Sequence, residues 1–397
     1  MTAAATSPRD AGSGRWAWAE IDLDAVAHNV AVVRRLAAPA EVWAVVKADA
    51  YGHGAVQVAR TVLAAGASGL CVALVQEAVE LRAAGVEAPV LVLSEQPPAT
   101  LVDAVHHGVI TTVASLAGID AIAAAGAHDH PIQLKVDTGM RRMGCRPDEV
   151  LTLVREIERR PSVRLDGVFT HLAVADEIAH PATAQQLDRF DAVLDDLRAA
   201  GIDPGRVHAA NSAGALAHPR ARHHLVRAGI ALYGIEPGPG VSHLCAELRP
   251  ALTLHARVSF VKRVAAGDRI SYGLRHAFAH DTVVTTVPIG YADGVPRRLF
   301  ETRGEVIVGG RRCPIVGVVT MDQLMVDVGP DADVAVGDPV VLLGGDRAGD
   351  VATTPTAPVR AEEWAERLGT IGYEIVCGIS RRIARHHVGG PVGGPVG

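Results

Sequence analysis

The chain has 397 residues, of which 49% are hydrophobic and 21% charged, so it has ample material for large buried cores. Its 44 acidic and 38 basic residues leave a net charge of −6. No basic block is interleaved with aromatics, which argues against a nucleic-acid partner. No apolar run reaches the roughly 18 residues of a membrane-spanning helix, and the N-terminus lacks the pattern of a secretory signal. We therefore expect a cytoplasmic protein with no membrane or nucleic-acid partner.

Lysine is rare in this sequence. Of the 38 basic residues only Lys47, Lys135 and Lys262 are lysines. A lysine can lose its proton and act as a nucleophile, which arginine cannot do, so the lysines are candidates for chemistry. The five scattered cysteines are typical of core thiols in a reducing compartment. No histidine or cysteine spacing matches a metal site, so none is predicted.

The two ends of the chain are expected to be disordered or flexible. Residues 1–15 are small and polar, and residues 388–397 form the repeat VGGPVGGPVG. Residues 16–245 are assigned to the first domain. Within them, β-branched runs alternate with Ala- and Leu-rich helical stretches, which favours βα units and a parallel sheet.

Eight strands are expected in the first domain, separated by helical stretches such as 76–84 and 184–199. The strand candidates are 42–47, 70–73, 90–93, 109–113, 132–136, 167–171, 207–210 and 225–227. Eight units in about 200 residues favour a closed (β/α)8 barrel. The alternative is a doubly wound open sheet, but its usual GxGxxG turn is missing after the first strand.

Residues 246–387 are assigned to a C-terminal, mostly-β domain. Short strand-like runs are separated there by turn signals such as AGD at 266–268. The runs are 251–261, 282–288, 305–308, 314–319, 324–328 and 339–343. One helix is predicted at 361–368, with Thr356 as a candidate cap.

In such a barrel, side chains at the C-terminal ends of the strands face the active site. Distinctive residues fall at these ends, namely Lys47, Lys135, His171, Asn211, Ser212 and Arg227. Each alone has an ordinary explanation as a rim charge, a core histidine or a helix cap. Their joint placement indicates a functional site.

The motifs around these residues resemble those of the alanine racemases, enzymes that use pyridoxal phosphate on an α/β barrel joined to a C-terminal β domain. The likeness runs from AEID at 19–22 to about residue 385, and its strongest stretch is AVVKADAYGHG at 44–54. The later motifs stand in the family's order: QLKVDTGMRRMG (133–144), THLAVADE (170–177), AANSAG (209–214), VRAGIALYG (226–234), SYG (271–273), GYADG (290–294), TMDQ (320–323) and YEIVCGIS (373–380).

The resemblance implies a set of residues that bind pyridoxal 5'-phosphate. Lys47 corresponds to the lysine that bonds covalently to the cofactor. Arg227 corresponds to the arginine on the pyridine nitrogen, with His171 as its orienting partner and Asn211 close by. The phosphate would be held by three hydroxyls and two backbone N–H groups, those of Tyr51, Ser212 and Tyr373 and those of Gly229 and Ile230.

The identity of the pyridine partner bears on the reaction. An arginine does not hand over its proton, so the ring nitrogen stays unprotonated and is a weaker electron sink than beside Asp or Glu. This suits racemisation better than transamination. It also makes a decarboxylase on the same two-domain fold a poorer match, because those enzymes have an acidic partner there.

Racemisation needs a base on each face of the α-carbon. The resemblance implies Lys47 for one face and Tyr272 of the partner subunit for the other. A tyrosine with a pKa near 10 needs a neighbour to activate it. Because Tyr272 and the substrate-contacting Met321 would come from the second chain, a homodimer with shared active sites is implied.

Further positions also match the family. Lys135 matches a lysine that is often carbamylated there and orients the arginine at Arg142, which contacts the cofactor and the substrate carboxylate. An entrance corridor for the substrate would be lined by Asp176, Tyr291, Arg297 and Ile371.

The chain departs from the family pattern at a few positions. The common GRVCMDQ is GVVTMDQ here, so Val318 replaces a corridor arginine and Thr320 a cysteine, which leaves substrate selectivity open. Ala384 replaces a usual proline, and Arg141 stands where glycine is common.

The leading hypothesis is interconversion of L- and D-alanine to supply D-alanine for peptidoglycan. One alternative is a racemase of another small amino acid such as serine. A second, from another class, is a protein that binds pyridoxal phosphate without turnover, although the long C-terminal domain and Tyr272 argue against it.

Overall fold

The computed structural model describes residues 14–345 and 356–390. The disorder expected for residues 1–13 and the flexibility expected for 391–397 lie outside the described residues. The chain divides into two compact units. We call Leu23–Ala251, with the residues after Val388, the barrel unit, and Leu252–Val388, with the residues up to Asp22, the β unit.

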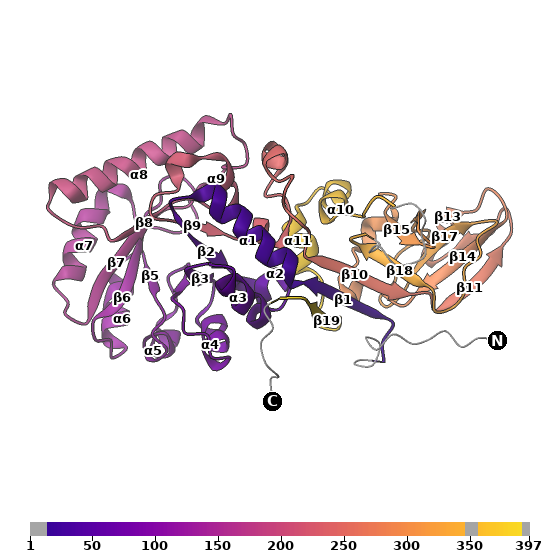
Figure 1. The fold of residues 1–397 in the computed structure, drawn as a ribbon, viewed down its shortest axis with the longest axis horizontal. Coiled ribbons are helices and arrows are strands. Elements are labelled where there is room, and N and C mark those ends of the chain that lie inside the picture. Colours follow the sequence, from indigo (N-terminus) through magenta and orange to yellow (C-terminus); the bar gives the residue numbers. More distant parts are fainter. Residues whose placement is uncertain (1–13, 346–355, 391–397) are drawn as a thin grey trace. The chain divides into compact units, whose positions relative to one another are not determined.

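The barrel unit contains the eight predicted parallel strands within its described residues (Figure 1). They are β2 (Glu41–Val45), β3 (Gly69–Val72), β4 (Val90–Val92), β5 (Thr111–Val113), β6 (His130–Lys135), β7 (Val163–Phe169), β8 (Arg206–His208) and β9 (Leu225–Ala228). Strand β2 pairs in parallel with both β3 and β9, so the last strand returns to the first. The two four-stranded ladders meet at the Leu91–Ile110 bridge and at the hydrogen bond from Arg227 N–H to Ala210 O, of 3.0 Å. The predicted (β/α)8 barrel is confirmed.

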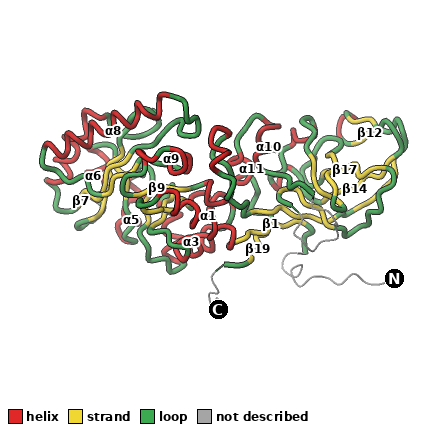
Figure 2. The backbone as a smooth tube through the Cα atoms, turned by 45° about the horizontal axis from the view of Figure 1, so that its top comes forward, coloured by secondary structure: helices red, strands yellow, loops and turns green. Residues whose placement is uncertain are grey.

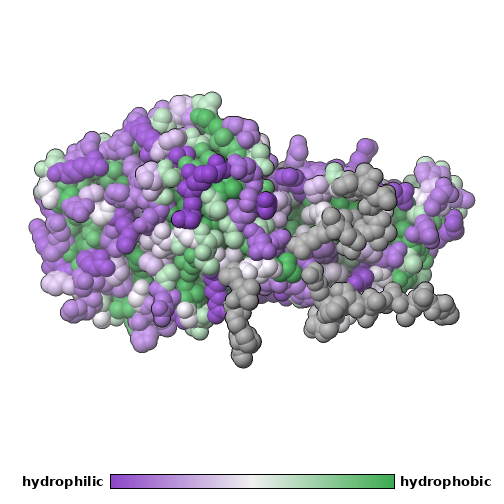
Figure 3. Space-filling model, viewed as in Figure 1, coloured by the Kyte–Doolittle hydropathy of each residue, from purple (hydrophilic) through white to green (hydrophobic). Residues whose placement is uncertain are grey.

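Helices surround these strands (Figure 2). They are α1 (Leu23–Ala37), α2 (Lys47–Gly52), α3 (Ala55–Ala64), α4 (Val75–Ala83), α5 (Pro98–His106), α6 (Leu116–Ala124), α7 (Val150–Glu158), α8 (Pro181–Ala199) and α9 (Ser212–Ala217). Helix α7 buries Val150, Leu153, Val154 and Ile157, the spacing of a single apolar stripe on a helix. The strands are buried on both faces, as in β2, where four consecutive residues are buried. In Figure 3, hydrophilic residues are spread over the visible face of this unit.

The β unit is built on a six-stranded sheet in the order β16-β15-β18-β10-β1-β19 and a three-stranded sheet in the order β11-β14-β17. The strands are β1 (Ala17–Asp22), β10 (Leu252–Arg257), β11 (Phe260–Val264), β14 (Thr282–Val287), β15 (Glu305–Val308), β16 (Arg311–Pro314), β17 (Leu324–Gly329), β18 (Pro339–Leu343) and β19 (Ala384–Val388), with a short ribbon of β12 (Arg269–Ile270) and β13 (His276–Ala277). Two helices complete it, α10 (Ala361–Leu368) and α11 (Gly372–Cys377). Its core includes Val264, Ile270, Phe278, Val284, Val316 and Met325. The predicted mostly-β architecture is confirmed.

The boundary between the two units differs from the predicted one. Strand β1 lies within the predicted barrel domain of residues 16–245, but it pairs with β10 and β19 of the β unit. Its partners are distant in sequence, so no local pattern shows the pairing. At the other end Val388 closes strand β19, and the N–H of Gly390 donates to Asp24 Oδ1 at 2.9 Å. Residues 388–390, predicted to be flexible, are therefore held in place.

Two predictions about the β unit were wrong. The run 314–319 is not a strand, because the strand ends at Pro314 and only Ile315 continues as a single bridge to Val326. Helix α10 is preceded by Arg360 in the cap position, whereas the Thr356 hydroxyl donates to Gly310 O. None of the helices in the described ranges is both long and apolar enough to cross a membrane.

Candidate active site

The barrel brings the predicted residues of its strand ends to one edge. Lys47 follows β2, Lys135 ends β6, and His171 lies two residues after β7. Ser212 begins α9, the helix that follows β8, and Arg227 lies in β9. Because all these strands are parallel, their carboxyl ends share one rim of the barrel.

The segment after Lys47 has an unusual backbone. Ala48, Asp49, Ala50 and Tyr51 all have φ between 52° and 55°, a left-handed turn that costs roughly 1–2 kcal/mol per non-glycine residue. The carboxylate of Glu77 in α4 clamps it, accepting from the N–H of Ala48 at 2.6 Å as well as from Ala73 and Leu74 at 2.8 and 3.1 Å. Asp49 Oδ1 also accepts from the N–H of Ala55, at 2.7 Å. The backbone at Lys47 is thus fixed from two sides.

Tyr51, Ser212 and Gly229 form a small cradle. The Gly229 N–H donates to Ser212 Oγ at 2.8 Å, and a Cβ at Gly229 would lie 2.6 Å from the Tyr51 hydroxyl. Any side chain at this position would collide with that hydroxyl, which explains the glycine. The 3-10 turn Ile230–Tyr233 follows directly. The Gly229 N–H, expected to face a phosphate, is engaged with Ser212 in this structure.

Arg227 is buried inside the barrel, and both of its Nη atoms are hydrogen-bonded. Its Nη2 donates to the backbone oxygens of Thr170 and Ala209 at 2.8 and 3.1 Å and lies 3.2 Å from His171 Nδ1. Its Nη1 contacts Nδ1 of His208. Burial lowers the pKa of Arg227 to about 10, so the guanidinium is still a cation at neutral pH.

Both histidines next to Arg227 are neutral at physiological pH. Burial, followed by the charge of Arg227, holds the pKa of His171 and of His208 well below the usual value. Each can therefore accept a hydrogen bond from the guanidinium. His171 contacts Arg227 as predicted, whereas Asn211 caps helix α9 by accepting from the N–H of Gly214 at 2.9 Å.

Lys135 is a buried lysine with a weakened hold on its proton. Its Nζ donates to Leu93 O at 3.0 Å and lies 5.3 Å from the centre of the Phe169 ring. Burial lowers its pKa from 10.5 to about 7, with further contributions from the positive charges of Arg227, Arg142 and Lys47. A substantial share of Lys135 is therefore a neutral amine near pH 7. Arg142 itself is exposed.

The loop geometry at Arg141 explains why glycine is common at this position. Its φ is +58°, a region in which glycine has no steric cost. Its N–H donates to Asp137 Oδ1 at 3.0 Å. The backbone geometry accounts for glycine as the residue expected here.

The predicted residues of the β unit lie on neighbouring loops. The N–H groups of Tyr291 and Ala292 donate to the backbone oxygens of Thr320 and Met321, each at 3.0 Å. The Ser271 hydroxyl donates to Val318 O at 2.8 Å, which ties the SYG loop to the same cluster. The side chain of Val318 is buried. The Thr320 hydroxyl donates to Gln323 O at 2.8 Å within its own turn.

Asp293 anchors the GYADG loop. Its side chain is fully buried and accepts from the guanidinium of Arg15 at 2.6 Å and from the N–H of Gly290 at 3.0 Å. Arg382 lies 3.3 Å from its other oxygen. The loop that carries Tyr291 is therefore held to the rest of the β unit by ion pairs to the buried Asp293.

The side chains that these loops present are unusually exposed. Tyr272 is 71% exposed, Ile371 58%, Met321 52% and Tyr291 42%. Arg297 is also exposed, and Tyr373 lies in helix α11. Asp176, the corridor residue in the barrel unit, is packed so closely against Gly238 that a Cβ there would lie 2.4 Å from its carboxylate.

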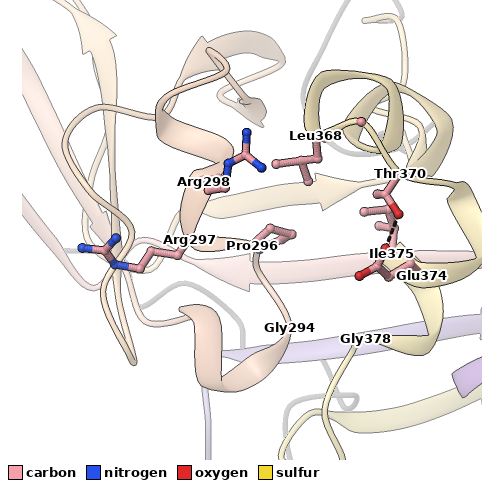
Figure 4. Close-up of a pocket in the computed structure, with 10 residues that line it drawn as sticks. Gly294, Pro296, Arg297, Arg298, Leu368, Thr370, Glu374, Ile375 and Gly378 are labelled. Atoms are coloured by element: carbon pink, nitrogen blue, oxygen red, sulfur yellow. Dashed lines mark hydrogen bonds between the residues drawn. The ribbon is translucent and has the colours of Figure 1, made fainter.

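A cavity of about 480 Å³ lies within the β unit beside the corridor residue Arg297. Figure 4 shows Arg298 beside Leu368, whereas the Arg297 side chain extends away from them. The Thr370 hydroxyl donates to the carboxylate of Glu374, which lies next to it in the lining of the cavity. The lining of this cavity combines two arginines, Glu374 and Thr370 with small and apolar residues.

The barrel rim carries a concentration of positive charge. The charges of Lys47, Arg142 and Arg227 all act on Lys135, and Asp137 alone opposes them in the balance of its pKa. Such a concentration of positive charge favours phosphate and carboxylate groups. Within the described ranges, no group of three or more His, Cys, Asp or Glu residues is placed to hold a metal ion.

Three residues next to the predicted site were not predicted from the sequence: Glu77, His208 and Gln133. A signal for Gln133 was present, since it stands two positions before Lys135 on a buried strand. Alternation along a strand places such residues on one face. Glu77 gave no such signal for its contact with the turn after Lys47, because Ala48, whose N–H donates to it, lies 29 residues away.

Comparison with known proteins matches both units. The family model "Alanine racemase, N-terminal domain" matches residues 21–237, and "Alanine racemase, C-terminal domain" matches residues 251–387. The chain belongs to the alanine racemase family. An alanine racemase of Symbiobacterium thermophilum is 47% identical over 375 residues, which cover 94% of this chain and 97% of that protein.

Solved alanine racemase structures resemble the chain over nearly its whole length. The enzyme of D-cycloserine-producing Streptomyces lavendulae is 39% identical, with a TM-score of 0.87 over 95% of this chain and 98% of that one. The Bacillus anthracis enzyme, solved with bound L-Ala-P, is 40% identical, with a TM-score of 0.86 over 94% and 95%. The family predicted from the motifs is confirmed.

Proposed function

We propose that this protein interconverts L- and D-alanine with pyridoxal 5'-phosphate as its cofactor. The observation that carries the proposal is the convergence of Lys47, Lys135 and the buried cation Arg227 at one barrel rim. It is supported by the family membership and by the L-Ala-P that the Bacillus anthracis enzyme binds in its crystal structure. The product D-alanine would supply peptidoglycan synthesis, in the cytoplasm.

The residues of the cradle would hold the cofactor. Lys47 would bond to its carbonyl carbon, and the phosphate would meet Tyr51, Ser212, Gly229, Ile230 and Tyr373. When bound, the cofactor draws electrons from the substrate and makes its α-proton removable. Arg227 would face the ring nitrogen and, because its pKa of about 10 keeps it a cation at neutral pH, would leave that nitrogen without a proton.

Lys135 would be carbamylated. Its pKa of about 7 leaves a neutral amine whose lone pair attacks the carbon of carbon dioxide. A nitrogen–carbon bond forms, one carbon–oxygen π bond becomes an oxyanion, and the nitrogen releases a proton. The positive charge of Lys135 is thereby replaced by a negative one beside Arg142, which would orient that arginine toward the substrate carboxylate.

Two bases would exchange the α-proton. Lys47 would act on one face of the α-carbon and Tyr272 on the other. The 71% exposure of Tyr272 supports its pairing with a second chain, since a base in a water-filled site cannot direct a proton to one face. We therefore propose a homodimer in which Tyr272 and Met321 complete the partner's site, with a corridor lined by Asp176, Tyr291, Arg297 and Ile371.

The test follows α-proton loss by NMR and D-alanine by chiral chromatography, after adding L-alanine and pyridoxal phosphate to the protein in heavy water. The proposal predicts deuterium exchange accompanied by D-alanine. Exchange with retained configuration would contradict the role of Tyr272. If alanine shows no exchange but serine or another small amino acid is turned over, that amino acid would replace alanine as the proposed substrate. No exchange with any amino acid would favour a binding protein without turnover.

A further inference from the structure

A connected series of polar side chains crosses the interior of the barrel. Gln133 of β6, Asp166 of β7, His208 of β8 and Arg227 of β9 are all buried. Barrel interiors are usually filled by branched apolar residues, and a buried polar group is costly unless it is hydrogen-bonded. These four form one connected series, which suggests a role beyond packing.

The geometry of the series is continuous. Arg227 Nη1 contacts His208 Nδ1, and His208 Nε2 lies 2.9 Å from Gln133 Oε1. Gln133 Nε2 donates to Asp166 Oδ2, also at 2.9 Å. The second oxygen of Asp166 accepts from Arg206 at 2.7 Å. The series of hydrogen bonds therefore runs from the buried Arg227 to the carboxylate of Asp166. That carboxylate is held by a second, half-exposed arginine, Arg206.

The direction of every hydrogen bond follows from Asp166. An ionised carboxylate only accepts, so Gln133 must turn its NH2 toward Asp166 and its carbonyl oxygen toward His208. That oxygen is also only an acceptor, so Nε2 of His208 carries the ring hydrogen. The lone pair of a neutral His208 is then on Nδ1, where it accepts from Arg227.

The opposite tautomer would break this arrangement. A hydrogen on Nδ1 would point at the guanidinium, which has only donors, and the Nη1 end of Arg227 would be pushed away while Nη2 stays bonded to the backbone. The His208 ring is held in its plane by stacking on Phe169, with ring centres 4.7 Å apart, so it has little freedom to adjust. The far end of the series thus controls the orientation of Arg227.

We propose that Gln133 and Asp166 are positioning residues that lock His208 as the Nε2–H tautomer and so hold the Arg227 guanidinium in one orientation. The inference rests on the proposed function for its catalytic meaning, since there Arg227 faces the pyridine nitrogen. A guanidinium that turns away would let that nitrogen take a proton from water. The ring would then withdraw electrons more strongly and favour transfer of the amino group to the cofactor.

The first test concerns the tautomer and needs no turnover. The cofactor-free protein is labelled with 15N-histidine, and the ring nitrogens of His208 are assigned by comparison with His208→Gln. We expect one protonated nitrogen, Nε2, in the wild type. We expect this pattern to be lost in Gln133→Glu, whose carboxylate draws a second proton onto the ring, and in Asp166→Asn, which no longer dictates the amide orientation.

The second test measures reaction specificity. In abortive transamination the amino group passes to the cofactor, water is consumed and pyruvate leaves. The ratio of pyruvate to D-alanine therefore measures how often transamination replaces racemisation. We expect this ratio to rise roughly tenfold in Gln133→Glu and Asp166→Asn, with kcat lowered by a similar factor and KM nearly unchanged, an effect typical of residues that orient a binding group.

Two matched controls separate positioning from stability. Arg164→Gln removes a half-exposed partner that lies 3.3 Å from the same Asp166 carboxylate, without reversing any bond of the series. His130→Gln removes a different buried histidine, which lies in β6 with its Nε2 3.3 Å from the Thr111 hydroxyl. Both should keep the wild-type tautomer and the wild-type pyruvate ratio, even if they lower the melting temperature.

The outcomes are distinguishable. An Nδ1–H tautomer in the wild type, or an unchanged His208 pattern in both series variants, would overturn the inference while leaving racemisation intact. The same holds if His130→Gln raises the pyruvate ratio as much as Gln133→Glu. If the wild type forms no D-alanine at all, the proposed function fails, and the ring-nitrogen spectrum still decides the tautomer.

Discussion

The barrel rim and the loops of the β unit carry the two halves of the proposed chemistry in contrasting ways. On the barrel, Arg227 is buried, and the turn after Lys47 is clamped by Glu77. On the β unit, Tyr272 and Met321 project from loops with more than half of their surface exposed. The first half is organised within one chain, whereas the second has its backbone fixed but its side chains uncovered. This contrast is what the proposed homodimer would require, because a partner chain would then cover the exposed side chains.

Replacing Tyr272 by Phe tests the exposed half and should have the largest effect. Loss of one of two bases is expected to slow racemisation by about 10²- to 10⁴-fold, equally in both directions because the two enantiomers have the same free energy. Solvent exchange of the α-proton should survive for the enantiomer that Lys47 deprotonates. Chiral chromatography with NMR in heavy water measures both. Equal loss of exchange for both enantiomers would contradict the separate roles.

Lys135 tests the electrostatics of the buried half. Its folded-state pKa of about 7 lies below the ordinary 10.5, so between these values the unfolded chain binds more protons than the folded one. Stability therefore rises with pH across this window, by up to a few kcal/mol, and is lowest below pH 7. In Lys135→Met this rise should be absent. Denaturant unfolding of the cofactor-free protein in CO2-free buffer measures it.

The exposed Lys262 supplies the matched control for this pH dependence. Lys262→Met should keep the wild-type rise in the free energy of unfolding between pH 7 and 10. Parallel curves of unfolding free energy against pH for wild type and Lys135→Met would show that burial does not lower the pKa of Lys135.

Glu77→Gln tests the clamp on the left-handed turn. The amide has one acceptor oxygen in place of two, so at least one of the three backbone N–H groups loses its partner, at a cost of about 1–3 kcal/mol. We expect a lower melting temperature and a weaker bond between Lys47 and the cofactor, seen in the absorbance spectrum. Glu80→Gln, on the exposed face of α4, should change neither. A spectrum identical to wild type in Glu77→Gln would show that the clamp does not position Lys47.

Arg141→Gly should have the smallest effect and the opposite sign. Its φ of +58° suits glycine, so relief of strain is expected to add up to about 1 kcal/mol to the free energy of unfolding. Arg155→Gly, at an exposed site inside α7, should cost about 1 kcal/mol. Thermal unfolding compares the two, and a destabilised Arg141→Gly would show that the position carries no strain.

Much of the fold and of the barrel site could be predicted from the sequence. Eight β-branched runs at regular spacing indicate the strands, and the position of Lys47, Lys135 and Arg227 at or near strand ends indicates a shared rim. What could not be predicted depends on distant pairing. Strand β1 joins β10 more than 200 residues later, and the tautomer of His208 depends on Gln133 and Asp166 from two other strands.

Mixing two inactive variants tests whether the exposed half serves the neighbouring chain. Lys47→Ala and Tyr272→Phe are refolded together, so that a mixed dimer has one site with both bases intact and one with neither. We predict recovery to about a quarter of wild-type activity for random pairing of a symmetric dimer. Mixed dimers with no recovered activity would contradict the shared site, because each site would then draw both bases from one chain.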